Sequence, residues 1–157
     1  MKKFLIIITA VLFVNLTANG QNLFIIGEKS YPSTEAITLE SNSDSGYELN
    51  VFIAKHSTEG LIGVSTKSVL GEEFSGKLII YLEDGNVLIC TKSDASEKVD
   101  DRAIALYKLS GDQLDKLKTS DINTVKYSKT WLSEQTYSAS NNGIETSTLI
   151  SDFFKIN

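Results

Sequence analysis

The chain has 157 residues, of which 20 are acidic and 15 basic, and its formal net charge is −5. This acidic balance, without a cluster of Lys or Arg, argues against nucleic-acid binding, which depends on neutralising phosphates, and against attachment to anionic membrane surfaces. Cys90 is the only cysteine, which excludes an internal disulfide.

Residues 1–20 have the three parts of a secretory signal peptide. Two lysines follow the initial methionine, an apolar run occupies residues 4–14, and small or polar residues dominate positions 15–20. The apolar run is shorter than the roughly 20 residues that a bilayer-spanning helix needs, and no cysteine marks a lipoprotein attachment site. We predict cleavage near Gly20 or Gln21. A buried N-terminal strand is the alternative interpretation.

Removal of the signal would leave residues 21–157, which is long enough for one globular domain with its own hydrophobic core. Lys2 and Lys3 would leave with the signal, so 13 basic and 20 acidic residues would remain, with a net charge of −7. We therefore predict a single exported globular domain that is soluble, periplasmic or secreted, and not stably inserted in a membrane.

The start of this domain is predicted to alternate short strands with turns. A strand at residues 23–26 precedes a turn at residues 28–33, which contains the only proline. A strand at residues 36–40 follows, with Ile37 and Leu39 on one face, and the polar run after it at 41–46 is predicted to be a loop.

Residues 49–56 and 61–68 are predicted to pair as a hairpin around a turn at residues 57–60. Apolar residues alternate along both arms, as expected for strands with one buried face. Gly63 interrupts the second arm and indicates a bulge or the close approach of another backbone.

The strongest local signal is a second hairpin, formed by residues 77–82 and 87–91. The connecting residues 83–86 contain Asp-Gly, and glycine adopts a positive φ without steric cost. Apolar side chains lie on both faces of the first arm, so we expect both faces to be covered. The hairpin is therefore predicted at the centre of a sheet rather than at its edge.

A polar loop at residues 93–101 and a strand at residues 102–109 are predicted next. Ser110 and Gln113 have the spacing of a capping box, which predicts a short helix at residues 111–119. Its apolar residues, Leu114 and Leu117, are one turn apart and are expected to face the sheet.

The C-terminal region is less regular in sequence. A strand is predicted at residues 122–128, residues 129–136 are left unassigned, and residues 137–143 are predicted to be a loop. Paired apolar residues at helical spacing favour a helix at residues 146–156. A strand at residues 146–150 is the competing interpretation.

These elements predict an α+β fold. It consists mainly of an antiparallel sheet built from hairpins, with one short internal helix and a C-terminal helix on one side. A β-barrel or a β-sandwich is the alternative architecture.

No combination of residues predicts nucleophilic or metal chemistry. A catalytic triad would have to use His56, the only histidine, and nothing in the sequence places it beside Cys90. We interpret Cys90 as a small buried hydrophobic residue. One histidine and one cysteine do not make a usual zinc site, and residues 42–46 match only part of a calcium-binding loop.

Three pairs of adjacent acids could in principle serve a glycosidase. Neighbours on a strand point to opposite faces, so adjacency alone makes no catalytic pair. Glu72 and Glu73 are expected to be exposed. We therefore predict no catalytic, cofactor-binding or metal-binding residues and no cofactor. The three pairs are Glu72/Glu73, Glu83/Asp84 and Asp100/Asp101.

Three aromatic residues lie close together in the sequence: Tyr127, Trp131 and Tyr137. We expect them to fill the core or the seam between helix and sheet. In the alternative interpretation they are exposed and stack on sugars or anchor a partner protein.

Residues 77–128 carry the one resemblance to known proteins. The run KLIIYLEDGNVLIC, followed by VDDRAIALYKLSGDQLDKLKTSDINTVKYS, resembles small exported proteins of the Bacteroidota that have no assigned function. Those proteins also join an Asp-Gly hairpin to a Tyr-x-Leu strand, a short Leu-x-x-Leu helix and a further strand. The resemblance covers about a third of the chain. It implies this organisation and a bacterial exported setting, and it assigns no functional residue.

The leading functional hypothesis is a non-enzymatic module that binds a partner or takes part in a cell-envelope assembly, with an unknown protein or glycan as the partner. One alternative is a hydrolase of glycans or peptides that uses carboxylates brought together by the fold. The other is an acidic inhibitor or immunity-type protein that binds a basic partner.

Overall fold

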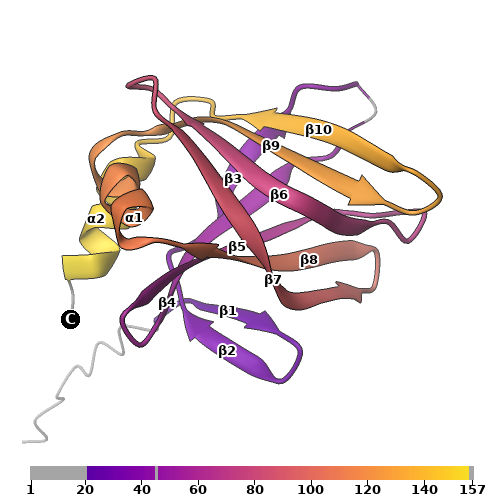
Figure 1. Cartoon of the computed structure of the whole chain (residues 1–157), viewed down its shortest axis with the longest axis horizontal. Helices are drawn as coiled ribbons and strands as arrows, with labels where there is room; N and C mark the ends of the chain where they lie inside the picture. Colours follow the sequence, from indigo (N-terminus) through magenta and orange to yellow (C-terminus); the bar gives the residue numbers. More distant parts are fainter. Residues whose placement is uncertain (1–20, 45, 156–157) are drawn as a thin grey trace, which may run out of the picture.

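The computed structural model describes residues 21–44 and 46–155, and its main body is a closed barrel of eight antiparallel strands (Figure 1). The predicted signal peptide lies outside the described residues. Around the barrel the strands follow the order β10-β3-β4-β5-β8-β7-β6-β9. Their bounds are β3 Ile37–Ser41, β4 Leu49–His56, β5 Glu59–Lys67, β6 Glu73–Leu82, β7 Val87–Val99, β8 Arg102–Leu109, β9 Ile122–Thr130 and β10 Glu134–Ser140.

Barrel closure corrects the predicted architecture. The antiparallel hairpins and both helices are confirmed, but the sheet is a closed barrel, which was the alternative fold. The prediction missed β10, because a loop was expected at residues 137–143 and this strand buries only Ala139 among largely polar residues. β10 pairs with β9 along its length and then meets β3 at a short seam, where Ala139 pairs with Ser41 and Ser140 with Glu40.

The hairpin of β6 and β7 forms as the Asp-Gly signal predicts. Leu78 pairs with Cys90 and Tyr81 with Val87, and Gly85 in the turn has a φ of 88°. Both arms have further neighbours, β9 and β8, so the hairpin is not at an edge. The expectation that both faces are covered is wrong, because Val87 and Ile89 on the outer face are exposed.

Strand β7 is longer than predicted and replaces the loop expected at residues 93–101. The pairing with β8 shifts register between Lys92, which pairs with Tyr107, and Ser96, which pairs with Ala105. Such a bulge interrupts the alternation of side chains and so hides a strand from a search for period two. The connection to β8 is a turn at residues 100–101, in which Asp100 has a φ of 53°.

A separate hairpin, β1 (Leu23–Ile26) and β2 (Lys29–Pro32), lies against the outside of the barrel (Figure 1). It buries Phe24 and Tyr31 against Leu61 and Leu106. The turn predicted at residues 28–33 is therefore wrong. The chain turns at Gly27, whose φ is 58°, and the proline ends a two-stranded edge ribbon, where a missing N–H is tolerated.

The bulge or close backbone approach predicted at Gly63 is wrong, because its pairing with Phe52 and Leu106 is regular and the group that comes close is the side-chain ring of Phe24. A Cβ atom added to Gly63 would lie 2.5 Å from Cε2 of Phe24. The glycine in β5 thus leaves the space into which the N-terminal hairpin inserts its aromatic ring.

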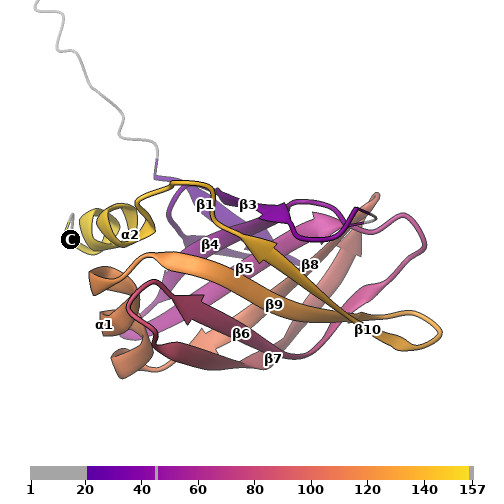
Figure 2. The ribbon, with the colours of Figure 1, turned by 90° about the horizontal axis from the view of Figure 1, so that it is seen from above.

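Two helices cover one end of the barrel (Figure 2). Helix α1 (Gly111–Thr119) begins with the predicted capping box, and α2 (Thr146–Lys155) confirms the helix predicted there rather than the competing strand. Apolar residues of both helices join the hydrophobic cluster of the barrel; these are Leu114, Leu117 and Ile150.

The carboxylate of Asp121 anchors the start of α2. Its Oδ1 accepts hydrogen bonds from the backbone N–H and the hydroxyl of Ser147, each at 2.7 Å. The bond from the backbone N–H is the main reason that the pKa of Asp121 lies below its usual value. The anchor fixes α2 directly at the beginning of β9.

The barrel interior is filled with side chains. Inward-facing residues from all eight strands belong to one buried hydrophobic cluster, as is usual in barrels of this size. Ala103, Ala105, Ile122 and Val125 are fully buried within it. Of the buried polar residues, Ser120 and Thr146 lie beside the helices, whereas Thr66, Ser68 and Lys129 lie towards the opposite end of the barrel.

Candidate binding site at the barrel mouth

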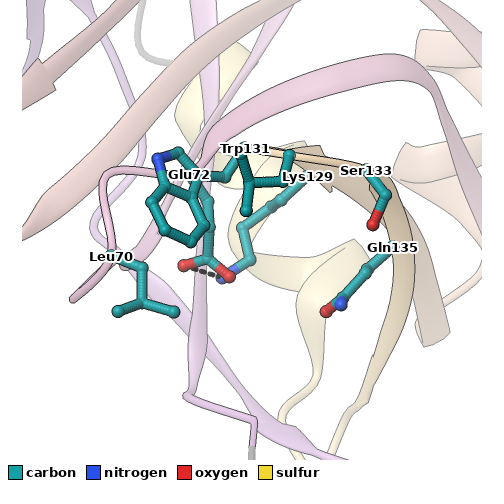
Figure 3. A pocket seen from close by; sticks show the side chains of 7 residues that line it. Leu70, Glu72, Lys129, Trp131, Ser133 and Gln135 are labelled. Atoms are coloured by element: carbon teal, nitrogen blue, oxygen red, sulfur yellow. Dashed lines mark hydrogen bonds and ion pairs between the residues drawn. The ribbon is translucent and has the colours of Figure 1, made fainter.

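The barrel mouth, at the end away from the helices, is bordered by the loops between β5 and β6 and between β9 and β10 (Figure 1). A pocket of about 230 Å³ lies between these loops, and we call it the mouth pocket (Figure 3). Its lining residues are Leu70, Glu72, Lys129, Trp131, Leu132, Ser133 and Gln135.

An ion pair forms the floor of the mouth pocket. Lys129 Nζ lies 3.2 Å from Glu72 Oε2, and the two side chains are only 5% and 17% exposed. The hydroxyl of Tyr137 lies 2.7 Å from Gln135 Oε1 and 3.3 Å from Glu72 Oε1, so these two acceptors share its one proton. The ring of Tyr137 lies 4.6 Å from the ammonium. Burial of two charges is tolerated here because each has a partner.

The alternation of β9 explains why a lysine faces the interior. Val125 and Tyr127 are buried on the inner face, and two further residues along the strand bring Lys129 to the same face. The prediction ended this strand at residue 128 and so missed Lys129. Extending the two-residue period by one step would have found it.

Glu72 corrects a second expectation. It was predicted to be exposed together with Glu73, but it points into the barrel mouth while Glu73 is exposed. Its partner Lys129 is 57 residues away in the sequence, so no local sequence pattern predicts the pair.

Exposed apolar side chains flank the ion pair. Trp131 is 55% exposed and Leu132 is 83% exposed, and the neighbouring loop contributes Val69 and Leu70, which are also exposed. The aromatic cluster therefore divides. Tyr127 and Tyr137 stack inside the barrel with ring centroids 5.6 Å apart, as the core interpretation predicts, whereas Trp131 faces solvent, as the binding interpretation requires.

The structure places Cys90 and His56 in different environments. Cys90 is fully buried on the inner face of β7, and His56 is exposed at the end of β4, where its ring makes an edge contact with Tyr31. Burial raises the pKa of the Cys90 thiol to about 12. The thiol is therefore protonated at neutral pH, which supports its interpretation as a small hydrophobic residue.

We expect iodoacetamide to label Cys90 rapidly in urea at pH about 8.5 and to leave it unlabelled in the folded protein on the same timescale, because only the thiolate reacts. Raising the pH from 9.0 towards 12 ionises the thiol only in the unfolded chain, so the free energy of unfolding should fall over that range. Equal labelling rates in the two states, measured by mass spectrometry, would contradict the buried position.

The other acid pairs have structural roles. Asp84 accepts hydrogen bonds from the backbone and the side chain of Asn86 within the hairpin turn, and these bonds lower its pKa. Glu83 accepts a bond from Asn123. Asp101 lies 3.8 Å from Lys67 at an exposed position. Within residues 21–44 and 46–155, no group of three or more His, Cys, Asp or Glu side chains could hold a metal ion.

In the part of the chain that the structure describes, neither helix has the length and apolar character needed to cross a membrane. Comparison with protein-family models, with curated proteins and with solved structures found no match.

Proposed function

We propose that residues 21–157 form a non-enzymatic exported binding module that recognises its partner at the mouth pocket. The pattern of residues 1–20 supports export to the periplasm or the medium. The observation that carries the proposal is the position of Trp131 and Leu132, which are exposed directly beside a buried ion pair.

The apolar rim supports recognition by direct contact. Clustered large apolar side chains at a surface mark interaction sites more often than scattered ones do. Tryptophan is also enriched among the residues that contribute most to binding energy. Trp131, Leu132 and Leu70 line one pocket from two loops, so a bound partner would cover all three together.

The pocket chemistry supports binding over hydrolysis. Glycosidases use two carboxyl groups about 5 to 9.5 Å apart. Glu72 is the one acid among the residues that line the mouth pocket, and it is paired with Lys129 at 3.2 Å, so the pocket holds no second carboxyl group. A carboxylate-based hydrolase therefore has less support from this pocket than a binding module has.

A capture experiment with matched variants tests the proposal. Tagged residues 21–157 would be incubated with envelope and culture fractions of the source cells, alongside the variants Trp131→Ala and Ile89→Ala. Ile89 is 52% exposed on the outer wall of the barrel, close to the 55% of Trp131. We expect the wild type and Ile89→Ala to retain the same bound material and Trp131→Ala to lose at least about tenfold.

The emission of Trp131 provides a second readout, because it is the only tryptophan in the chain. Eluted material should shift the emission of the wild type and of Ile89→Ala when it is added back. Equal capture by all three proteins, together with unchanged Trp131 emission, would show that the mouth is not the recognition surface.

A further inference from the structure

The mouth pocket combines an apolar wall with a polar wall. Trp131 and Leu70 lie on one side of the Glu72–Lys129 pair, and Ser133 and Gln135 lie on the other (Figure 3). We propose that this pocket binds one ring of a neutral glycan. The inference rests on the proposed function, because it names the ligand class of the same site.

The size of the pocket limits what it can hold. Sites for drug-sized ligands have volumes of about 300 to 1,000 Å³, whereas the mouth pocket has about 230 Å³. It therefore fits a single ring or a single side chain of a larger molecule. The open rim leaves room for the rest of a chain to continue over the surface.

The floor of the pocket favours a neutral ligand. Glu72 only accepts hydrogen bonds and Lys129 only donates them, and together they carry no net charge. A charged ligand would be attracted by one member of the pair and repelled by the other, so the pair gives it little net electrostatic gain. A hydroxyl group both donates and accepts, so adjacent hydroxyls of a sugar can satisfy both residues at once.

The unused hydrogen-bonding capacity of Lys129 points the same way. Its ammonium has three N–H donors, of which one is directed to Glu72 Oε2, while the ring of Tyr137 lies 4.6 Å from the nitrogen. The side chain of Lys129 is only 5% exposed. A hydrogen-bond acceptor on a ligand in the pocket would occupy one of the remaining N–H donors. Ser133 adds a hydroxyl that both donates and accepts. Gln135 Oε1 accepts a hydrogen bond from Tyr137 at 2.7 Å, so its side chain offers mainly the two N–H donors of the amide.

The apolar wall matches the other face of a sugar ring. One face of a pyranose carries mainly C–H groups, and these stack against the negative face of an aromatic ring. Trp131 offers such a face at an exposed position beside the polar floor. A sugar ring thus presents apolar C–H groups and hydroxyls in the arrangement that the two walls require.

The test uses residues 21–157 and titrates Trp131 emission with the methyl glycosides of glucose, galactose, mannose and N-acetylglucosamine. Sodium octanoate serves as the apolar anion for comparison. We expect saturable binding of at least one glycoside with a dissociation constant of about 1 mM. Gln135→Ala should weaken that binding by about three- to tenfold, since a hydrogen bond is lost, while Ile89→Ala should leave it unchanged.

The outcomes separate the ligand class from the proposed function. A response to octanoate or only to a captured protein would overturn the glycan assignment and leave the mouth as a binding site. Glycoside binding that Gln135→Ala and Ser133→Ala leave unchanged would also overturn it. No response to any of the five compounds, with capture that does not depend on Trp131, would overturn both proposals.

Discussion

Replacing Glu72 by Leu should lower the free energy of unfolding by about 3–5 kcal/mol, because Lys129 would remain charged and unpaired in a site where its side chain is 5% exposed. The double variant Glu72→Leu/Lys129→Met replaces both charges by apolar groups of similar size. It should recover most of the lost stability and could equal the wild type. Urea unfolding with an unchanged m-value measures both effects.

An exposed ion pair provides the matched control for this cycle. Lys67 and Asp101 lie 3.8 Å apart with side chains 45% and 62% exposed, so Asp101→Asn should cost less than about 1 kcal/mol. If the double variant at the mouth is as unstable as the sum of its two single variants, the pair is not the coupled unit described above. A stable double variant that no longer binds its ligand would assign the pair to recognition.

Replacing Gly63 by Ala should destabilise the protein by about 1–3 kcal/mol, through overpacking against the ring of Phe24. The added Cβ would lie 2.5, 2.6 and 2.7 Å from three atoms of that ring. The ring is also held by Phe52, with centroids 5.2 Å apart, so it has little freedom to move aside. We expect the N-terminal hairpin to detach from the barrel, which amide hydrogen exchange at β1 and β2 would reveal.

A double-mutant cycle isolates this contact. In a Phe24→Ala background the ring is absent, and Gly63→Ala should then cost much less than it does in the wild type. Gly111→Ala is the control, because its added Cβ meets nothing within 4 Å and its position at the start of α1 suits alanine. If Gly63→Ala lowers the free energy of unfolding equally with and without the Phe24 ring, the destabilisation arises within β5 and not from contact with that ring.

Local chemistry made several elements predictable. The Asp-Gly turn of the central hairpin and the capping box of Ser110 and Gln113 act within a few residues, and both are present as expected. Gly63 was recognised as unusual within its strand, but the sequence indicated a bulge or a backbone approach, whereas the close neighbour is the ring of Phe24. The turn and capping signals need no knowledge of the rest of the chain.

Elements that depend on distant partners were missed. The bulge after Lys92 disrupts the alternation of β7, and the polar residues of β10 become a strand because β9 pairs with them. The barrel closes through β10, which lies between β9 and β3. Without this strand, the sequence predicted the barrel only as an alternative to an open sheet. Of the mouth pocket, the sequence singled out Trp131 as a possible contact residue, whereas the partnership of Glu72 and Lys129 depends on closure.

We expect the short seam between β3 and β10 to form late in folding. Those strands come from opposite ends of the domain, and two residue pairs join them. The backbone and side chain of Asn42 and the side chain of Asn142 add hydrogen bonds across the seam. Contacts of such long range form late, since they require the intervening chain to be arranged first. A chain that has only partly left the ribosome therefore lacks β10, the last strand of the barrel. In the folded protein, we expect β3 and β10 to separate before the other strand pairs under mechanical load or in mild denaturant.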